Sequence, residues 1–152
     1  MAKISVTVER PIGAPAERVY GYLADYREHH PRILPAAFSE FRVEEGGVGA
    51  GTVFSMKMTV GGRTRAARAV VAEPEPGRVL TETIIGSGMV TTFTVLPEGE
   101  SSRVRFDTVW QSPGLRGLIE RLLVPRLLTP IYIEELAILD RYARERAVPQ
   151  PV

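Results

Sequence analysis

Six short segments that alternate apolar and polar residues follow one another between residues 38 and 110. They span 38–45, 52–60, 63–73, 78–85, 89–96 and 102–110, and turns rich in glycine or proline separate them. A period of two is typical of half-buried β-strands, and Gly61-Gly62 is a strong signal for a two-residue hairpin. Because parallel neighbours need long crossover connections, strands joined by such short turns must form a mostly antiparallel meander.

The segments before the meander predict one more strand and two short helices. Residues 3–10 alternate in the same way and form a seventh strand. Pro15 suits the first position of a helix that ends near Asp25, and a second short helix or turn covers residues 26–30, before Pro31 and Pro35.

After the meander, apolar residues from Leu115 to Ala143 recur at helical spacing. Pro125 and Pro130 predict a kink or break in this helix. A curved sheet and an apolar helix each need a partner that covers their hydrophobic face. The chain therefore predicts an α+β fold, in which a seven-stranded curved antiparallel sheet wraps around a long C-terminal helix and two short helices separate strands 1 and 2.

Composition restricts the classes of function. The 152 residues match one domain, expected over 1–147 with a flexible tail at 148–152. A net charge of +1 gives no field that attracts nucleic acid. The chain has no cysteine, no apolar run long enough to span a membrane and no signal-peptide pattern. We expect a cytoplasmic protein without stable membrane insertion, metal site or cofactor.

Two stretches carry a resemblance to a known superfamily. IGAPAERVYGYLADY, residues 12–26, resembles the first strand-to-helix junction of START and Bet v 1-like proteins, which include polyketide cyclases and dehydrases. PGRVLTETIIGSGMVTTFTVLPEGESSRVRFDTVW, residues 76–110, is similar to their middle strands, and the proline-interrupted terminal helix also fits. The resemblance covers residues 3–146 and implies the helix-grip fold. It does not imply one activity, since fold alone does not determine function.

The resemblance implies a ligand cavity between the concave face of the sheet and the long helix. Thr108 and Tyr132 are candidate hydrogen-bonding groups in that cavity. The alternative is that the methionine and aromatic residues of the strands and the long helix only fill a hydrophobic core. The expected lining consists of small, sulfur-containing, aromatic and neutral polar side chains: Phe54, Met56, Met58, Ala67, Ala69, Met89, Phe93, Phe106, Thr108, Trp110, Tyr132 and Leu136.

Candidate acid–base residues are few. His29 and His30 are expected to be loop histidines that face solvent, although either would suit proton transfer at a cavity mouth. Leu80, Glu82 and Ile84 share one face of a strand, and if this face points inward Glu82 becomes a buried general-base candidate. By the same alternation Arg105 and Asp107 point outward as a salt-bridged pair, and we expect Glu134 and Glu135 to face water.

Three functions remain after this reasoning. The first is a carrier that sequesters a small hydrophobic ligand, such as a lipid, polyketide or aromatic metabolite. The second is a polyketide cyclase or dehydratase that uses one acid–base residue. The third is a protein-interaction module of the chaperone-activator type. Residues 118–133 are apolar enough to lie in a membrane interface, but the gripped helix, with an outer face available for a homodimer, is the simpler expectation.

Overall fold

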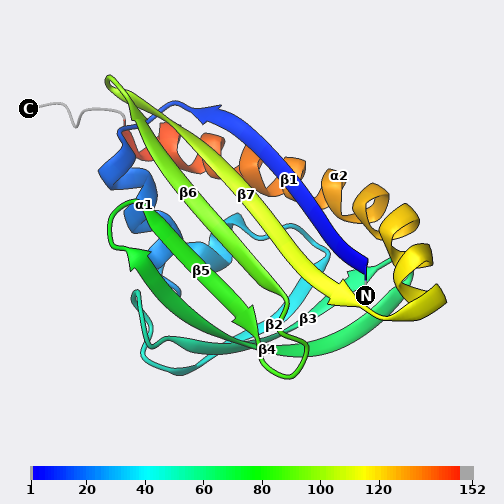
Figure 1. The fold of residues 1–152 in the computed structure, drawn as a ribbon. Helices are drawn as coiled ribbons and strands as arrows, with labels where there is room; N and C mark the ends of the chain where they lie inside the picture. Colours follow the sequence, from blue (N-terminus) through cyan, green and yellow to red (C-terminus); the bar gives the residue numbers. More distant parts are fainter. Residues whose placement is uncertain (1, 148–152) are drawn as a thin grey trace, which may run out of the picture.

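A computed structural model describes residues 2–147, in which one antiparallel sheet curves around a long helix (Figure 1). The strand order is β1-β7-β6-β5-β4-β3-β2. Every consecutive pair from β2 to β7 is therefore adjacent, and β1 pairs with β7 at one edge of the sheet. The predicted helix-grip fold is therefore confirmed. The elements are β1 (Ala2–Ile12), α1 (Ala16–Ala24), the 3-10 helix η1 (His30–Ile33), β2 (Phe38–Glu45), β3 (Val53–Val60), β4 (Arg63–Glu75), β5 (Val79–Ile84), β6 (Val90–Glu98), β7 (Ser101–Ser112) and α2 (Gly114–Ala147).

The hairpin between β3 and β4 forms where the glycine pair predicted it. Gly61 and Gly62 have φ angles of 58° and 78°, and a two-residue turn with both φ angles positive matches the right-handed twist of the flanking strands. The pairing of Val60 with Arg63 follows directly from this turn. The turn thus fixes the register in which β3 pairs with β4.

α2 continues through both of its prolines, so of the kink or break that they predicted, the break does not occur. Pro125 and Pro130 each lack the N–H group that would bond the carbonyl four residues earlier. Those carbonyls belong to Arg121 and Arg126, which are both exposed. Water is available to bond them there, and the helix is not interrupted.

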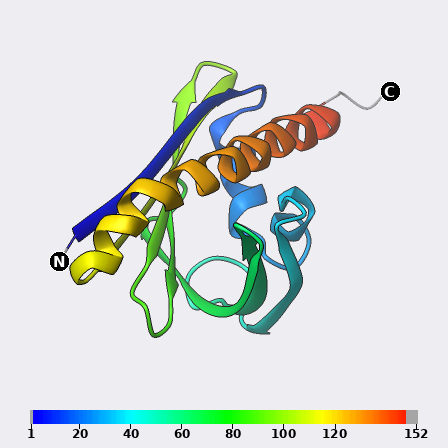
Figure 2. The same cartoon turned by 90° about the vertical axis from the view of Figure 1, so that its right-hand side faces the viewer.

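Most of the buried residues of α2 lie from Leu128 onward, although β1 runs beside the helix along most of its length (Figure 2). Gly117, near the start of α2, lies close to Ala2, and Gly13, just after β1, lies close to Arg144. The buried residues of this stretch include Leu128, Tyr132, Leu136, Leu139 and Ala143. The apolar residues nearer the start of the helix are each 49–72% exposed: Leu115, Leu118, Ile119, Leu122 and Leu123. The apolar stripe predicted from Leu115 to Ala143 is therefore helical throughout, but its buried part begins at Leu128.

The segment between α1 and β2 differs in detail from its prediction. Residues 26–29 form turns, and the second short helix is η1, which contains Pro31. Pro31 occupies the start of that helix, where its missing N–H costs no hydrogen bond. The expected single domain over residues 1–147 stays a prediction, and the expected flexible tail, 148–152, lies outside the described residues.

Candidate functional site

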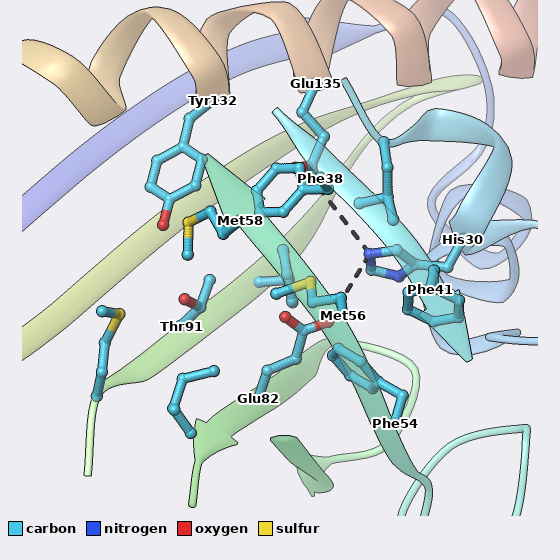
Figure 3. A pocket seen from close by; sticks show the side chains of 14 residues that line it. His30, Phe38, Phe41, Phe54, Met56, Met58, Glu82, Thr91, Tyr132 and Glu135 are labelled. Atoms are coloured by element: carbon cyan, nitrogen blue, oxygen red, sulfur yellow. Dashed lines mark ion pairs between the residues drawn. The ribbon is translucent and has the colours of Figure 1, made fainter. Parts of the chain in front are cut away.

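A pocket lies between α2, η1 and the inner face of the sheet (Figure 3). Strand alternation aims residues of β2, β3, β5 and β6 into it, and α2 closes it with Tyr132 and Glu135. Most of the wall is aromatic or aliphatic, which is the usual character of a small-molecule site. The lining consists of His30, Leu34, Phe38, Phe41, Phe54, Met56, Met58, Glu82, Ile84, Met89, Thr91, Phe93, Tyr132 and Glu135.

The pocket is nearly filled by its own side chains. The space open to the centre of a water-sized sphere is about 30 Å³, which is room for about two water molecules. Sites for small molecules are commonly about 300–1,000 Å³. Met56, Met58 and Met89 lie in the wall, and unbranched, flexible methionine side chains rearrange more easily than β-branched ones. A ligand much larger than water therefore requires these side chains to move.

Six of the predicted lining residues are in the wall and six are not. Ala69, Phe106 and Leu136 are buried in the core outside the pocket, and Ala67 is half-buried. Trp110 lies near the first half of α2, where its Nε1 donates a hydrogen bond to Glu120 at 3.3 Å. The predicted residues that line the pocket are Phe54, Met56, Met58, Met89, Phe93 and Tyr132.

Thr108 lies just behind the wall and connects two residues that belong to it. Its Oγ1 is 2.8 Å from Thr91 Oγ1 and 2.7 Å from the Tyr132 hydroxyl. Burial raises the pKa of Tyr132 to about 12, so this hydroxyl stays protonated near neutral pH. The result is a neutral hydrogen-bonded chain from β6 through β7 to α2.

A second polar group gathers around His30. The imidazole Nε2 is 3.7 Å from a carboxylate oxygen of Glu82 and 4.0 Å from one of Glu135 (Figure 3). The Tyr26 hydroxyl, from the loop after α1, donates a 2.6 Å hydrogen bond to Glu82. The His30, Glu82 and Glu135 side chains are only 2%, 12% and 4% exposed. We call Tyr26, His30, Glu82 and Glu135 the acidic cluster.

Hydrogen bonding assigns the proton on His30. Its Nδ1 is 2.6 Å from the carbonyl oxygen of Leu23, and a carbonyl only accepts, so Nδ1 carries the hydrogen. Burial lowers the pKa of His30 to about 4. Near neutral pH the ring is therefore neutral, and the lone pair of Nε2 points toward the two carboxyl groups.

The pKa values of the two carboxyl groups are raised, in contrast to that of His30. Burial raises the pKa of Glu82 to about 7, although the hydrogen bond from Tyr26 acts to lower it. Burial and the nearby charge of Glu82 raise the pKa of Glu135 well above its usual range. Both shifts favour the protonated carboxyl group, and Glu82 is close to half-titrated near neutral pH. Acids and bases suited to proton transfer have pKa values in this region.

The structure corrects two expectations about this cluster. His30 does not face solvent, because it is stacked on Tyr26 with ring centroids 4.5 Å apart. Glu135 does not face water either, whereas Glu134 does. Glu135 follows Tyr132 by three residues and precedes Leu139 by four, so helical periodicity placed it on the buried face. That signal was available in the sequence and was missed.

Of the two acid–base candidates His29 and Glu82, only Glu82 lines the pocket. The His29 Nδ1 is 2.6 Å from the Tyr142 hydroxyl, outside the pocket, so the two adjacent histidines lie in different environments. Leu80, Glu82 and Ile84 share the inward face of β5, and Glu82 lines the pocket. This is the arrangement in which Glu82 is a buried general-base candidate.

Arg105 and Asp107 form the expected outward salt bridge, 2.8 Å long.

Among residues 2–147, no three histidine, aspartate or glutamate side chains are arranged to hold a metal ion. No helix in this part of the chain is long and apolar enough to cross a membrane.

Comparison with known proteins agrees with this architecture. Residues 3–144 match the family model described as polyketide cyclase / dehydrase and lipid transport. The solution structure of the KanY protein is 31% identical, with a TM-score of 0.83, over 95% of this chain and 99% of that one. No curated protein matches the sequence.

Two more distant structures share the fold. The di-domain aromatase/cyclase StfQ of the steffimycin biosynthetic pathway is 19% identical, with a TM-score of 0.77, over 96% of this chain and 52% of that one. Norcoclaurine synthase from Thalictrum flavum, in complex with dopamine and hydroxybenzaldehyde, is 17% identical with a TM-score of 0.73, over 97% and 90%. From its sequence match and its helix-grip architecture, the chain belongs to the polyketide cyclase/dehydrase and lipid transport family.

Proposed function

We propose that this protein binds a small, mostly apolar molecule in the pocket beneath α2, with a polar group of the ligand at the acidic cluster. The observation that carries the proposal is the composition of the wall, where aromatic and methionine side chains from β2, β3, β6 and α2 converge beside buried polar groups. Such walls bury the body of a ligand while a few polar groups orient it. A lipid, a polyketide and an aromatic metabolite all have this character.

Native mass spectrometry of freshly purified protein tests this function. A reproducible adduct that is released on denaturation and extracted into organic solvent is the expected result. Met58→Trp fills the pocket with a larger side chain and should abolish the adduct. Leu118→Trp, at a position that is 55% exposed on α2, is the matched control and should retain it. A clean apo mass, with no thermal shift across a panel of lipids and aromatic polyketides, would contradict the proposal.

A cyclase or dehydratase is the second candidate function, and the acidic cluster favours it. Burying three titratable side chains costs stability unless they are paired, and a passive carrier has no evident need for that cost. In a dehydration, Glu82 accepts the proton from carbon and Glu135 protonates the departing hydroxyl. The C–H and C–O bonds break, the C=C bond forms and water leaves.

Substitution distinguishes the carrier from the enzyme. Glu135→Gln removes the acid but preserves the shape of the side chain. A carrier leaves the extracted ligand chemically unchanged with or without the substitution, so only its affinity can change. An enzyme converts the ligand, and its turnover is lost in the variant. His29→Gln, outside the pocket, should change neither quantity. Unchanged conversion of the extracted ligand by Glu135→Gln would exclude Glu135 as the acid.

A further inference from the structure

Apart from the exchangeable protons of its two carboxyl groups, the polar end of the pocket offers hydrogen-bond acceptors and few available donors. The Nδ1–H of His30 is occupied by Leu23, and the Tyr26 hydroxyl is occupied by Glu82. What faces the pocket is the lone pair of His30 Nε2 and the carboxyl oxygens of Glu82 and Glu135. None of the fourteen residues that line the pocket, all in the described part of the chain, is lysine or arginine.

We propose that the ligand of this pocket carries a protonated primary or secondary amine, held between the carboxyl groups of Glu82 and Glu135. This inference rests on the ligand-binding function proposed above and names the chemical class of the ligand. Both carboxyl groups lie within 4.0 Å of the same imidazole nitrogen. An ammonium group beside that nitrogen is therefore within reach of both, and its N–H groups match the acceptors that surround it.

Charge separates the amine from other polar groups. Two buried carboxyl groups without a neighbouring cation resist ionisation, and a cation bound between them removes that penalty. A ligand carboxylate would bring a third acidic group to the same place with no lysine or arginine in the wall to neutralise it. An alcohol offers a single donor and no charge. The site consequently favours amine over alcohol, and alcohol over carboxylate.

The binding step also predicts a change in protonation. In the empty pocket burial favours the protonated form of Glu135 and holds Glu82 close to half-titrated at neutral pH. When an ammonium group enters, a carboxyl group gives up its proton to solvent and the amine keeps its own. A protonated carboxyl and R–NH3+ thus become an ammonium–carboxylate pair and one released H+, with His30 and Tyr26 remaining neutral.

Titration calorimetry on the full chain tests this with matched probes. The probes are a 3-phenylpropyl and a decyl body, each as the amine, the alcohol and the corresponding carboxylate. At pH 7 we expect at least one amine to bind at least tenfold more tightly than its alcohol, with the carboxylate weakest. Titrations in phosphate and in HEPES, whose ionisation enthalpies differ and neither of which is a primary or secondary amine, should report up to one proton released per amine bound.

Variants link the preference to the cluster. Glu82→Gln with Glu135→Gln preserves side-chain shape and should reduce amine affinity to that of the alcohol and abolish proton release. Glu134→Gln, on the exposed face of α2, should leave both unchanged. Alcohols that bind as tightly as the amines, or an amine preference that survives the double substitution, would overturn the amine assignment alone. If no probe binds and the purified protein carries no adduct, the ligand-binding function itself fails, and this assignment with it.

Discussion

Replacing Glu82 with glutamine tests whether the fold holds this carboxyl group against its tendency to ionise. Its side chain is 12% exposed, and burial raises its pKa from 4.5 to about 7. Each pKa unit corresponds to about 1.4 kcal/mol, so ionised Glu82 weakens the folded state by about 3 kcal/mol. From the linkage relation, about 2–3 kcal/mol of this arises between pH 5 and pH 8.

The direction of the effect follows from proton binding. Between about pH 4.5 and 7 the folded protein binds the Glu82 proton more tightly than the unfolded chain does, so stability falls as pH rises. His30 acts in the opposite direction. Its pKa is lowered from 6.5 to about 4, so its contribution is fully present above pH 6.5 and is lost as pH falls toward 4. The two effects partly cancel in the natural protein, and only a comparison with the variant isolates Glu82.

Urea unfolding at pH 5, 6, 7 and 8, followed by the fluorescence of the single tryptophan, Trp110, measures the difference. We expect the free energy of unfolding of Glu82→Gln to gain about 2–3 kcal/mol relative to the natural protein between pH 5 and pH 8. Glu134→Gln, an exposed glutamate on α2, is the control and should show no such gain. A difference between Glu82→Gln and the natural protein that stays constant with pH would refute this reasoning.

Three further predictions concern the structure around the pocket. Thr108→Val breaks the hydrogen bond to Tyr132 and should cost about 1–3 kcal/mol in urea unfolding, because it leaves a buried hydroxyl unpaired; a loss within experimental error would contradict this. Leu136→Ala, at a fully buried position, should lower the free energy of unfolding by about 2–5 kcal/mol. Leu122→Ala, at a position that is 67% exposed, should change it by no more than about 0.5 kcal/mol. Equal losses in the two variants would show that α2 packs differently. Burial acts to raise the pKa of Asp140, but hydrogen bonds from the N–H of Gly13 and from Arg10 and Arg144 lower it overall. Asp140→Asn should therefore lose stability at pH 7 in urea unfolding. This loss should shrink as pH falls below about 4, where the carboxylate of the natural protein becomes protonated.

The sequence by itself determined the strands and their connections. A period of two and short turns between segments leave an antiparallel meander as the only economical arrangement, and β2 occurs at the predicted bounds. Alternation also reduced Glu82 to two orientations, inward with Leu80 or outward. Local patterns suffice for such conclusions because side-chain direction in a strand depends on the backbone of that strand alone.

Tertiary structure decided which side chains meet. Periodicity shows that Tyr132, Glu135 and Leu139 share a face of α2, but only the position of the sheet shows that this face is covered while Leu115 and Leu122 remain exposed. Likewise no local pattern distinguishes His29 from His30. The chain turns between them, so that His30 reaches Leu23 and the two carboxyl groups. Contacts between residues distant in sequence depend on how elements pack, and the acidic cluster consists of residues from the loop after α1, η1, β5 and α2.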